Sequence, residues 1–251
     1  MIMKKLLTGI ENNFIDFLFP IKCVVCKKET GLKRKNKLIC TDCLANLSPS
    51  FNFYCPICEA RTIDAKLCFS CNLMIGNTEN KFYLDQLLYP FSYKDQSIQK
   101  IIKSFKYYFI KDLEAPISRL AINYLEKIKN QIDLNDLILI PAPLHKIKFN
   151  QRGYNQSELI AVRIAEYLNA EFTTDCLSKI KPTKDQANLK EDKRLENLKN
   201  SFLCIKPWLI TGKRVLLVDD VYTTGATMSE CARVLKEAGA KEIVGLVIAR
   251  G

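Results

Sequence analysis

The chain has 251 residues, 48% of them hydrophobic, and its 38 Lys and Arg against 27 Asp and Glu give a net charge of +11. This composition excludes a disordered chain and leaves room for one large domain and a smaller module. The excess of cations favours polyanions such as nucleic acid, phosphates or an acidic membrane face, although a lysine-rich solvated surface would give the same count. No apolar run approaches the ~20 residues that span a membrane.

The first 20 residues predict an amphipathic helix. Lys4 and Lys5 precede apolar residues at helical spacing, and Glu11 and Asp16 interrupt them. No small-residue cleavage site follows, so the segment is not typical of a secretory signal peptide. We expect helix 1–20 to pack on the protein, with a weak contact to a membrane surface as the alternative.

Eight of the 11 cysteines lie between positions 23 and 71 in four C-x-x-C pairs, which predict a double zinc-binding module over residues 21–78. Each pair can place two sulfurs on one metal from a tight turn, and two pairs complete a tetrahedral site. Consecutive pairing and an interleaved cross-brace are both possible. The pairs are Cys23/Cys26, Cys40/Cys43, Cys55/Cys58 and Cys68/Cys71.

The same cysteine spacing has two alternatives to zinc, namely disulfides and iron. Disulfides are disfavoured because no secretory signal is present, and iron in a rubredoxin-type site fits the same four sulfurs. Because every expected ligand is a cysteine, no open coordination position is implied, and the two metal sites should be structural. Cys176, Cys204 and Cys231 are far apart in sequence, and we expect ordinary buried side chains there.

Residues 79–251 alternate between strand and helix patterns, which predicts an α/β domain with a mostly parallel sheet and right-handed crossovers. Within this domain, the polar segment 181–202 is expected to be either a mobile lid or a surface helix. Strands are expected within 81–93, 136–140, 173–180, 215–218 and 242–249, and helices within 94–107, 112–129, 155–168 and 228–238.

The stretch from Val215 to Thr227 carries the clearest chemical signal. An apolar strand ends at Val218, and two carboxylates, Asp219 and Asp220, follow at the carboxyl end, where open α/β sheets bind ligands. Carboxylates accept hydrogen bonds from sugar hydroxyls and can hold hydrated Mg²⁺. A turn rich in hydroxyls follows, formed by Thr223, Thr224, Gly225, Ala226 and Thr227. It leads into a helix whose first N–H groups can bind phosphate.

A second candidate segment follows the strand at 136–140. Residues Pro141, Ala142, Pro143 and Leu144 open a loop that carries Lys146, Lys148 and Arg152 toward the next helix. Cations there can meet a diphosphate. The alternative is a solvated basic loop capped by Asn155 or Ser157. His145, the only histidine, is expected to be a loop residue rather than a catalytic base.

The run from Val218 to Thr227 resembles the phosphoribosyl-diphosphate (PRPP) motif of type I phosphoribosyltransferases. The resemblance implies that Asp219 and Asp220 contact the ribose hydroxyls, that residues 223–227 wrap the 5′-phosphate, and that PRPP binds with Mg²⁺. In related transferases the loop at 141–144 corresponds to the diphosphate-binding position. No residue that would bind an acceptor base or amine can be identified, so binding of PRPP is expected more than its turnover.

The order of motifs over nearly the whole chain resembles the ComF family. The motifs are Pro141-x-Pro143, Arg152 to Gln156, Gln186 with Leu189, Arg194, Asn197 and Phe202, and Val218 to Thr227, after a cysteine-rich front end. This resemblance implies a cytoplasmic role in natural transformation, including at the inner face of the membrane. The implied partners are single-stranded DNA and DNA-uptake helicase or recombination proteins.

Two other functions remain open at this point. One is an active phosphoribosyltransferase of nucleotide metabolism, which transfers phosphoribosyl from PRPP to a base or amine. The other is a purely structural adaptor built around the two zinc sites.

Overall fold

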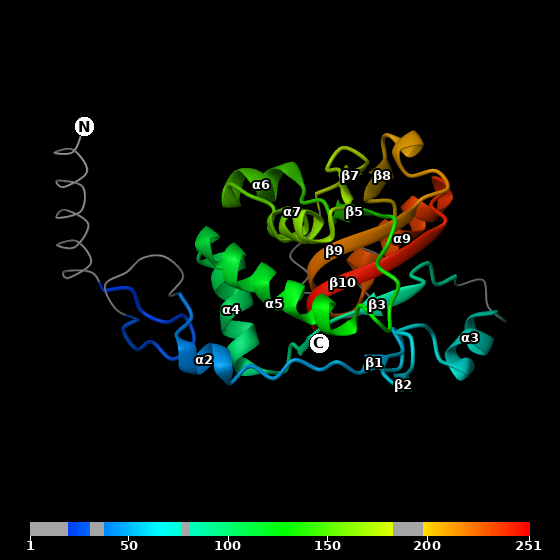
Figure 1. Ribbon diagram of the computed structural model, residues 1–251. Helices are drawn as coiled ribbons and strands as arrows, with labels where there is room; N and C mark the ends of the chain where they lie inside the picture. The colour runs from blue at the N-terminus through cyan, green and yellow to red at the C-terminus, as the bar shows by residue number, and fades with distance from the viewer. Residues whose placement is uncertain (1–19, 31–37, 77–80, 183–197) are drawn as a thin grey trace.

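The computed structural model describes residues 20–30, 38–76, 81–182 and 198–251 (Figure 1). The helix predicted for 1–20, most of segment 181–202 and the predicted domain boundary at 78/79 fall outside these ranges. Within the described ranges, no helix has the length and apolar character needed to cross a membrane.

A parallel sheet occupies the centre of the fold, as the sequence predicts (Figure 1). Strands β9 (Arg214–Tyr222) and β10 (Glu242–Arg250) pair over almost their whole length, and β5 (Leu137–Pro141) lies on the other side of β9. In the described chain the strand order is β3 (Gln86–Leu88), β10 (Glu242–Arg250), β9 (Arg214–Tyr222), β5 (Leu137–Pro141) and β6 (Glu171–Phe172), and β4 (Phe91–Ser92) also pairs with β10.

Apolar side chains cover both faces of the sheet, which explains the unbroken apolar run of β9. Leu216 and Val218 join one core, whereas Val215 and Leu217 join the other, because successive side chains of a strand point to opposite faces. The first core is built with helices α4 (Gln96–Tyr107), α5 (Glu114–Ile128) and α7 (Gln156–Leu168), and the second with α9 (Ala226–Glu237) and the hairpin of β7 (Leu177–Lys179) and β8 (Phe202–Cys204).

Three local expectations need correction. The strand predicted over 173–180 is broken, because the Thr173 hydroxyl accepts a hydrogen bond from the Asp175 N–H (3.1 Å) and bends the chain between β6 and β7. Strand β9 does not end at Val218 but continues to Tyr222, since residues up to 222 still pair with β10. The basic segment expected as a loop contains helix α6 (Lys146–Arg152), capped by the His145 ring.

Two of the three isolated cysteines are neighbours in the fold, which the sequence did not predict. Cys231 is fully buried in the second core, as predicted. Cys176 and Cys204, however, lie together at the end of the β7–β8 hairpin with their Sγ atoms 3.5 Å apart. Antiparallel pairing of these strands brings them together, and a separation of 28 residues in sequence concealed this.

The cysteine-rich segment packs against the sheet domain rather than standing apart. It contains α2 (Thr41–Ala45), β1 (Phe53–Tyr54), β2 (Arg61–Thr62) and α3 (Phe69–Gly76). Val24, Val25 and Ile39 belong to the first core, and Phe51 stacks on Tyr124 of α5 with 6.1 Å between ring centroids. Two short 3-10 turns, Lys111–Leu113 and Pro207–Leu209, complete the described elements.

Arg250, the last residue of β10, connects the sheet to the second half of this segment. Its side chain is 5% exposed, and its guanidinium donates to the carbonyls of Cys55 (2.9 Å), Pro56 (2.8 Å) and Ile57 (3.3 Å). The same group lies over the ring of Tyr222, 5.3 Å from its centroid. One buried cation therefore connects the Cys55 turn with the end of β9.

We expect Arg250→Lys to lower the free energy of unfolding by about 1–3 kcal/mol, because one ammonium cannot reach three carbonyls and leaves buried acceptors unpaired. Thermal unfolding of the zinc-loaded chain measures the effect. Arg163→Lys, which changes a half-exposed surface ion pair with Glu114, serves as the control and should shift the midpoint little. Equal midpoints for the two variants would contradict the assigned role of Arg250.

Candidate functional site

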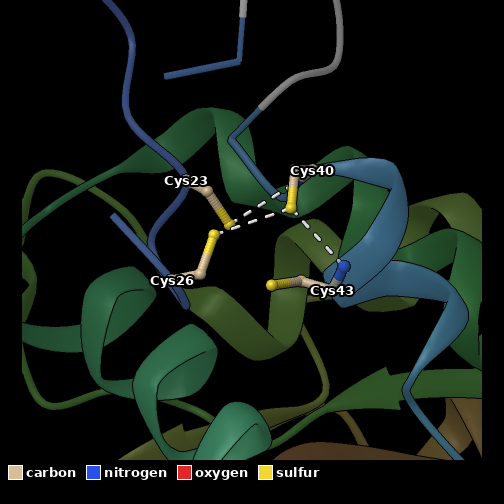
Figure 2. A group of neighbouring side chains, drawn as sticks. All are labelled: Cys23, Cys26, Cys40 and Cys43. Carbon is tan, nitrogen blue, oxygen red and sulfur yellow. Dashed lines mark hydrogen bonds between the residues drawn. The ribbon is translucent and has the colours of Figure 1, made fainter. Parts of the chain in front are cut away.

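Cysteine side chains gather in two separate groups of four. Cys23 and Cys26 meet Cys40 and Cys43 in the first group, whose side chains converge in Figure 2. The second group contains Cys55, Cys58, Cys68 and Cys71. In each group the ligand atoms all lie within 4.8 Å of one another, so the consecutive pairing is realised and the interleaved one is not.

The two groups share one backbone design. Each begins with a tight turn that is closed by a hydrogen bond to the first cysteine carbonyl, from the Lys27 N–H (2.9 Å) or the Glu59 N–H (3.1 Å). Both of these residues have positive φ, 65° and 61°. The second pair of each group then lies at the start of a helix, α2 or α3.

The sulfur geometry fits tetrahedral zinc. Zn–S bonds of about 2.3 Å place neighbouring sulfurs about 3.8 Å apart. The Sγ atoms of Cys26 and Cys40 are 3.7 Å apart, and those of Cys58 and Cys68 are 3.5 Å apart. The backbone N–H of Cys40 also points at the Cys23 sulfur (3.4 Å), as expected around a thiolate ligand.

Elemental analysis of the purified chain should find two zinc ions, because each group supplies a complete set of four sulfurs. Cys26→Ser removes an exposed ligand of the first group and should leave about one zinc. Cys231→Ser, in the second core, should retain both. Iron in place of zinc, or two zinc ions in Cys26→Ser, would contradict the assignment.

A polar pocket of about 300 Å³ opens at the carboxyl ends of β5 and β9. Eight of the twelve residues expected to bind PRPP or its diphosphate line it: Ala142, Pro143, Leu144, Arg152, Asp219, Asp220, Thr223 and Thr227. Pro141, Thr224, Gly225 and Ala226 are not among the described residues that line it. We call this cavity the acid-pair pocket, after Asp219 and Asp220.

Groups from two helices hold the acid pair. The Lys106 ammonium at the end of α4 lies 2.7 Å from Asp220 Oδ1. At the start of α7, the Ser157 hydroxyl donates to Asp219 Oδ1 (2.8 Å) and the Gln156 amide donates to Asp220 Oδ2 (3.4 Å). The acids are therefore oriented before any ligand arrives.

Burial and mutual repulsion perturb the charges in this pocket. Burial, followed by repulsion from Asp220, raises the pKa of Asp219 to about 7, despite the opposing attraction of Lys106. Burial alone would lower the pKa of Lys106, but attraction to Asp220 and Asp219 outweighs it, so the net shift is upward. The cation is thus fixed in its charged form beside the acids.

The turn after β9 requires glycine at position 225. Gly225 has φ of 74°, and a Cβ there would lie 2.2 Å from the hydroxyl of Tyr222, whose ring packs beneath the turn. Gly225 is also the N-cap of α9, and no side chain among the described residues caps this helix. The Thr224 hydroxyl is buried without a hydrogen-bond partner in the described chain. A helix start without a side-chain cap can present its backbone N–H groups to an anion.

The segment after β5 supplies another part of the pocket lining. The Asn155 amide donates to the Ala142 carbonyl (3.0 Å), and its carbonyl oxygen accepts from the Ser157 N–H (3.1 Å), so one residue fixes both the 141–144 loop and the start of α7. Arg152 of α6 lies over the ring of Tyr107, 6.0 Å from its centroid. Arg152 and Lys148 of α6 therefore add positive charge to the pocket that holds the acids.

The sequence did not predict several residues that line the pocket. Lys106, Tyr107, Tyr93 and Lys179 reach the pocket from elements distant along the chain. The sequence places Lys106 only in a helix, because no local pattern marks it as a partner of Asp220, 114 positions later. Ser157 and Gln156 belonged to a noted motif, and their contacts with the acids depend on how α7 docks beside β9.

Asp219→Asn should stabilise the protein at pH 8. The raised pKa means that folded Asp219 retains a proton between about pH 4 and 7 that the unfolded chain releases, so this group makes stability fall as pH rises through that window. The amide removes the penalty while its oxygen keeps the Ser157 hydrogen bond. We expect the melting temperature to rise by about 2 °C or more at pH 8, and the difference to vanish near pH 4. A variant that melts lower than the parent at pH 8 would contradict the electrostatics described here.

Comparison with known proteins finds counterparts for both parts of the chain. Residues 155–250 match the phosphoribosyl transferase domain family, and residues 14–72 match the double zinc ribbon domain family. The chain is 28% identical to competence protein F of Haemophilus influenzae, over 90% of this chain and 95% of that protein. It is 27% identical to the DNA utilization protein YhgH of Escherichia coli strain K12, over 75% and 86%. It is 25% identical to competence protein ComFC of Bacillus subtilis, over 83% and 82%.

Proposed function

Because the chain belongs to the ComF family of competence proteins, we propose that it binds PRPP with Mg²⁺ in the acid-pair pocket and handles single-stranded DNA during natural transformation. The supporting observation is the placement of Asp219 and Asp220 in one small pocket with Thr223, Thr227 and two basic side chains of α6. In this proposal the site lies on the cytoplasmic side of the membrane.

The pocket offers a complementary group for each part of PRPP. The two carboxylates accept hydrogen bonds from the ribose hydroxyls, and the uncapped start of α9 with Thr223 and Thr227 receives the 5′-phosphate. Lys148 and Arg152 line the same pocket and can pair with the diphosphate. Oxygen ligands on the acids and the diphosphate suit Mg²⁺, which would neutralise part of the phosphate charge.

The relatives and the charge support the role in DNA handling. The similar proteins carry the names competence protein and DNA utilization protein, and the net charge of +11 favours a polyanionic strand. Helicase or recombination proteins of DNA uptake would be its partners. Transfer of phosphoribosyl to a base or amine in nucleotide metabolism is the alternative role for the same pocket.

Calorimetric titration with Mg²⁺ and PRPP tests the ligand. The parent chain should bind, and Asp219→Asn combined with Asp220→Asn should weaken binding at least about tenfold, because each lost charged acceptor removes about 1.5–3 kcal/mol. Asp136→Asn is the matched control, since Asp136 is exposed and its φ of 52° suits asparagine. Equal binding by the double variant would contradict the proposed site.

Diphosphate release separates binding from turnover. Incubation of the chain with Mg²⁺, PRPP and either single-stranded DNA or a mixture of bases and amines should release no more diphosphate than the double variant does. Release that depends on a base or amine, and that is lost with Asp219 and Asp220, would favour the metabolic enzyme.

A further inference from the structure

Three consecutive aromatic side chains are exposed where α4 ends. Tyr107 is 52% exposed, Tyr108 73% and Phe109 53%. Among the described residues this is the only run of three large apolar side chains in a row that are all exposed. Single exposed apolar residues are ordinary, but a contiguous group of large rings is typical of an interaction surface. We call these three residues the aromatic platform.

The backbone at the platform is held in an unfavourable conformation. Phe109 has φ of 56°, in the left-handed region that bulky side chains avoid. The turn is fixed by hydrogen bonds from the Ile110 N–H to the Ser104 carbonyl (3.3 Å) and from the Lys111 N–H to the Phe109 carbonyl (2.9 Å). Because the Phe109 ring remains half exposed, burial within this chain does not compensate for the strain. Contact with an external partner would explain both features.

Cations of α4 and α6 lie near the Tyr107 end of the platform. Lys103 is exposed one helical turn before Tyr107 on α4, and Arg152 of α6 lies over the Tyr107 ring. Lys148 lies one turn before Arg152, so both project from the same side of α6. Helix α6, all of which is described, has no buried residue and no acidic residue in its first turn. The exposure of the three rings means that they do not fill the core.

The platform is continuous with the acid-pair pocket. Tyr107, Lys148 and Arg152 line that pocket, while Tyr108 and Phe109 are not among the described residues that do so. A ligand on the platform would therefore reach the pocket lining at Tyr107. Rings and cations that lead into a recessed polar pocket suit a flexible strand with alternating bases and phosphates better than they suit a flat bilayer.

We propose that the aromatic platform and its flanking cations form the binding surface for single-stranded nucleic acid, with bases stacked on the rings and phosphates beside Lys103, Lys148 and Arg152. This inference rests on the proposed function, to which it adds the location of the DNA. Stacking is tolerant of sequence, so the surface binds strands with little base preference. Arg152 and Tyr107 contribute to both the strand surface and the pocket.

The test uses fluorescence anisotropy of the full, zinc-loaded chain with a labelled oligothymidylate of about 16 nucleotides. Tyr108→Ala with Phe109→Asn removes two rings, and asparagine tolerates the left-handed backbone, so the fold should persist. We expect affinity for the strand to fall at least about tenfold, because each stacked base depends on a ring. Binding of Mg²⁺ and PRPP should not change. Trp208→Ala, which removes a 68% exposed ring outside the pocket and platform, should bind the strand as the parent does.

Salt dependence gives a second signature. Lys148→Gln with Arg152→Gln should reduce the slope of log affinity against log salt by about 1.4, since a single strand contributes roughly 0.7 per phosphate contact. The ring variant should keep the parent slope.

The outcomes separate this inference from the proposed function. If the parent binds the strand and the ring variant binds it equally well, the platform is refuted while the proposed function stands. If the parent binds no strand even at low salt, the proposed DNA role itself fails. Vesicles of phosphatidylglycerol provide the remaining comparison: loss of vesicle binding in the ring variant, with strand binding unchanged, would make the platform a membrane contact and overturn the inference.

Discussion

Two adjacent carboxylates share one pocket, and their charge has to be compensated by groups from other parts of the fold. Asp219 and Asp220 repel each other, and burial disfavours their charge, so the structure must bring compensating groups to them. Lys106 at the end of α4 supplies a cation at 2.7 Å, and Ser157 at the start of α7 supplies a hydrogen-bond donor. Helices α4 and α7 pack on the same face of the sheet. Because of this shared packing, two segments that are distant in sequence both contact the acid pair.

The second cysteine cluster contributes to the same arrangement at the carboxyl ends of β9 and β10. The turn at Cys55 presents its carbonyls to Arg250, and Arg250 lies over Tyr222, whose ring supports Gly225. A contiguous set of contacts therefore leads from the second cysteine cluster to the turn that starts α9. The cysteine-rich module helps to shape the sheet domain, because its residues Val24 and Val25 are part of the first core.

The sequence predicted what depends on local pattern. The spacing of the C-x-x-C pairs predicted both clusters. The apolar run, its two acids and the threonine-rich turn predicted part of the pocket lining, because strand, turn and helix signals lie within a dozen residues there. It did not predict contacts between distant segments. Lys106 looks like any lysine of an amphipathic helix, and Cys176 and Cys204 look isolated until β7 pairs with β8. Strand β9 extended past Val218 because pairing with β10, rather than hydrophobicity, sets its end.

A crystal structure of the chain grown with Mg²⁺ and PRPP tests the central claim most directly. The account predicts density for the ribose against Asp219 and Asp220, with the 5′-phosphate at residues 223–227 and the start of α9, and the diphosphate on the side of Lys148 and Arg152. Ligand density elsewhere on the molecule, or a ribose that makes no contact with either acid, would contradict the account.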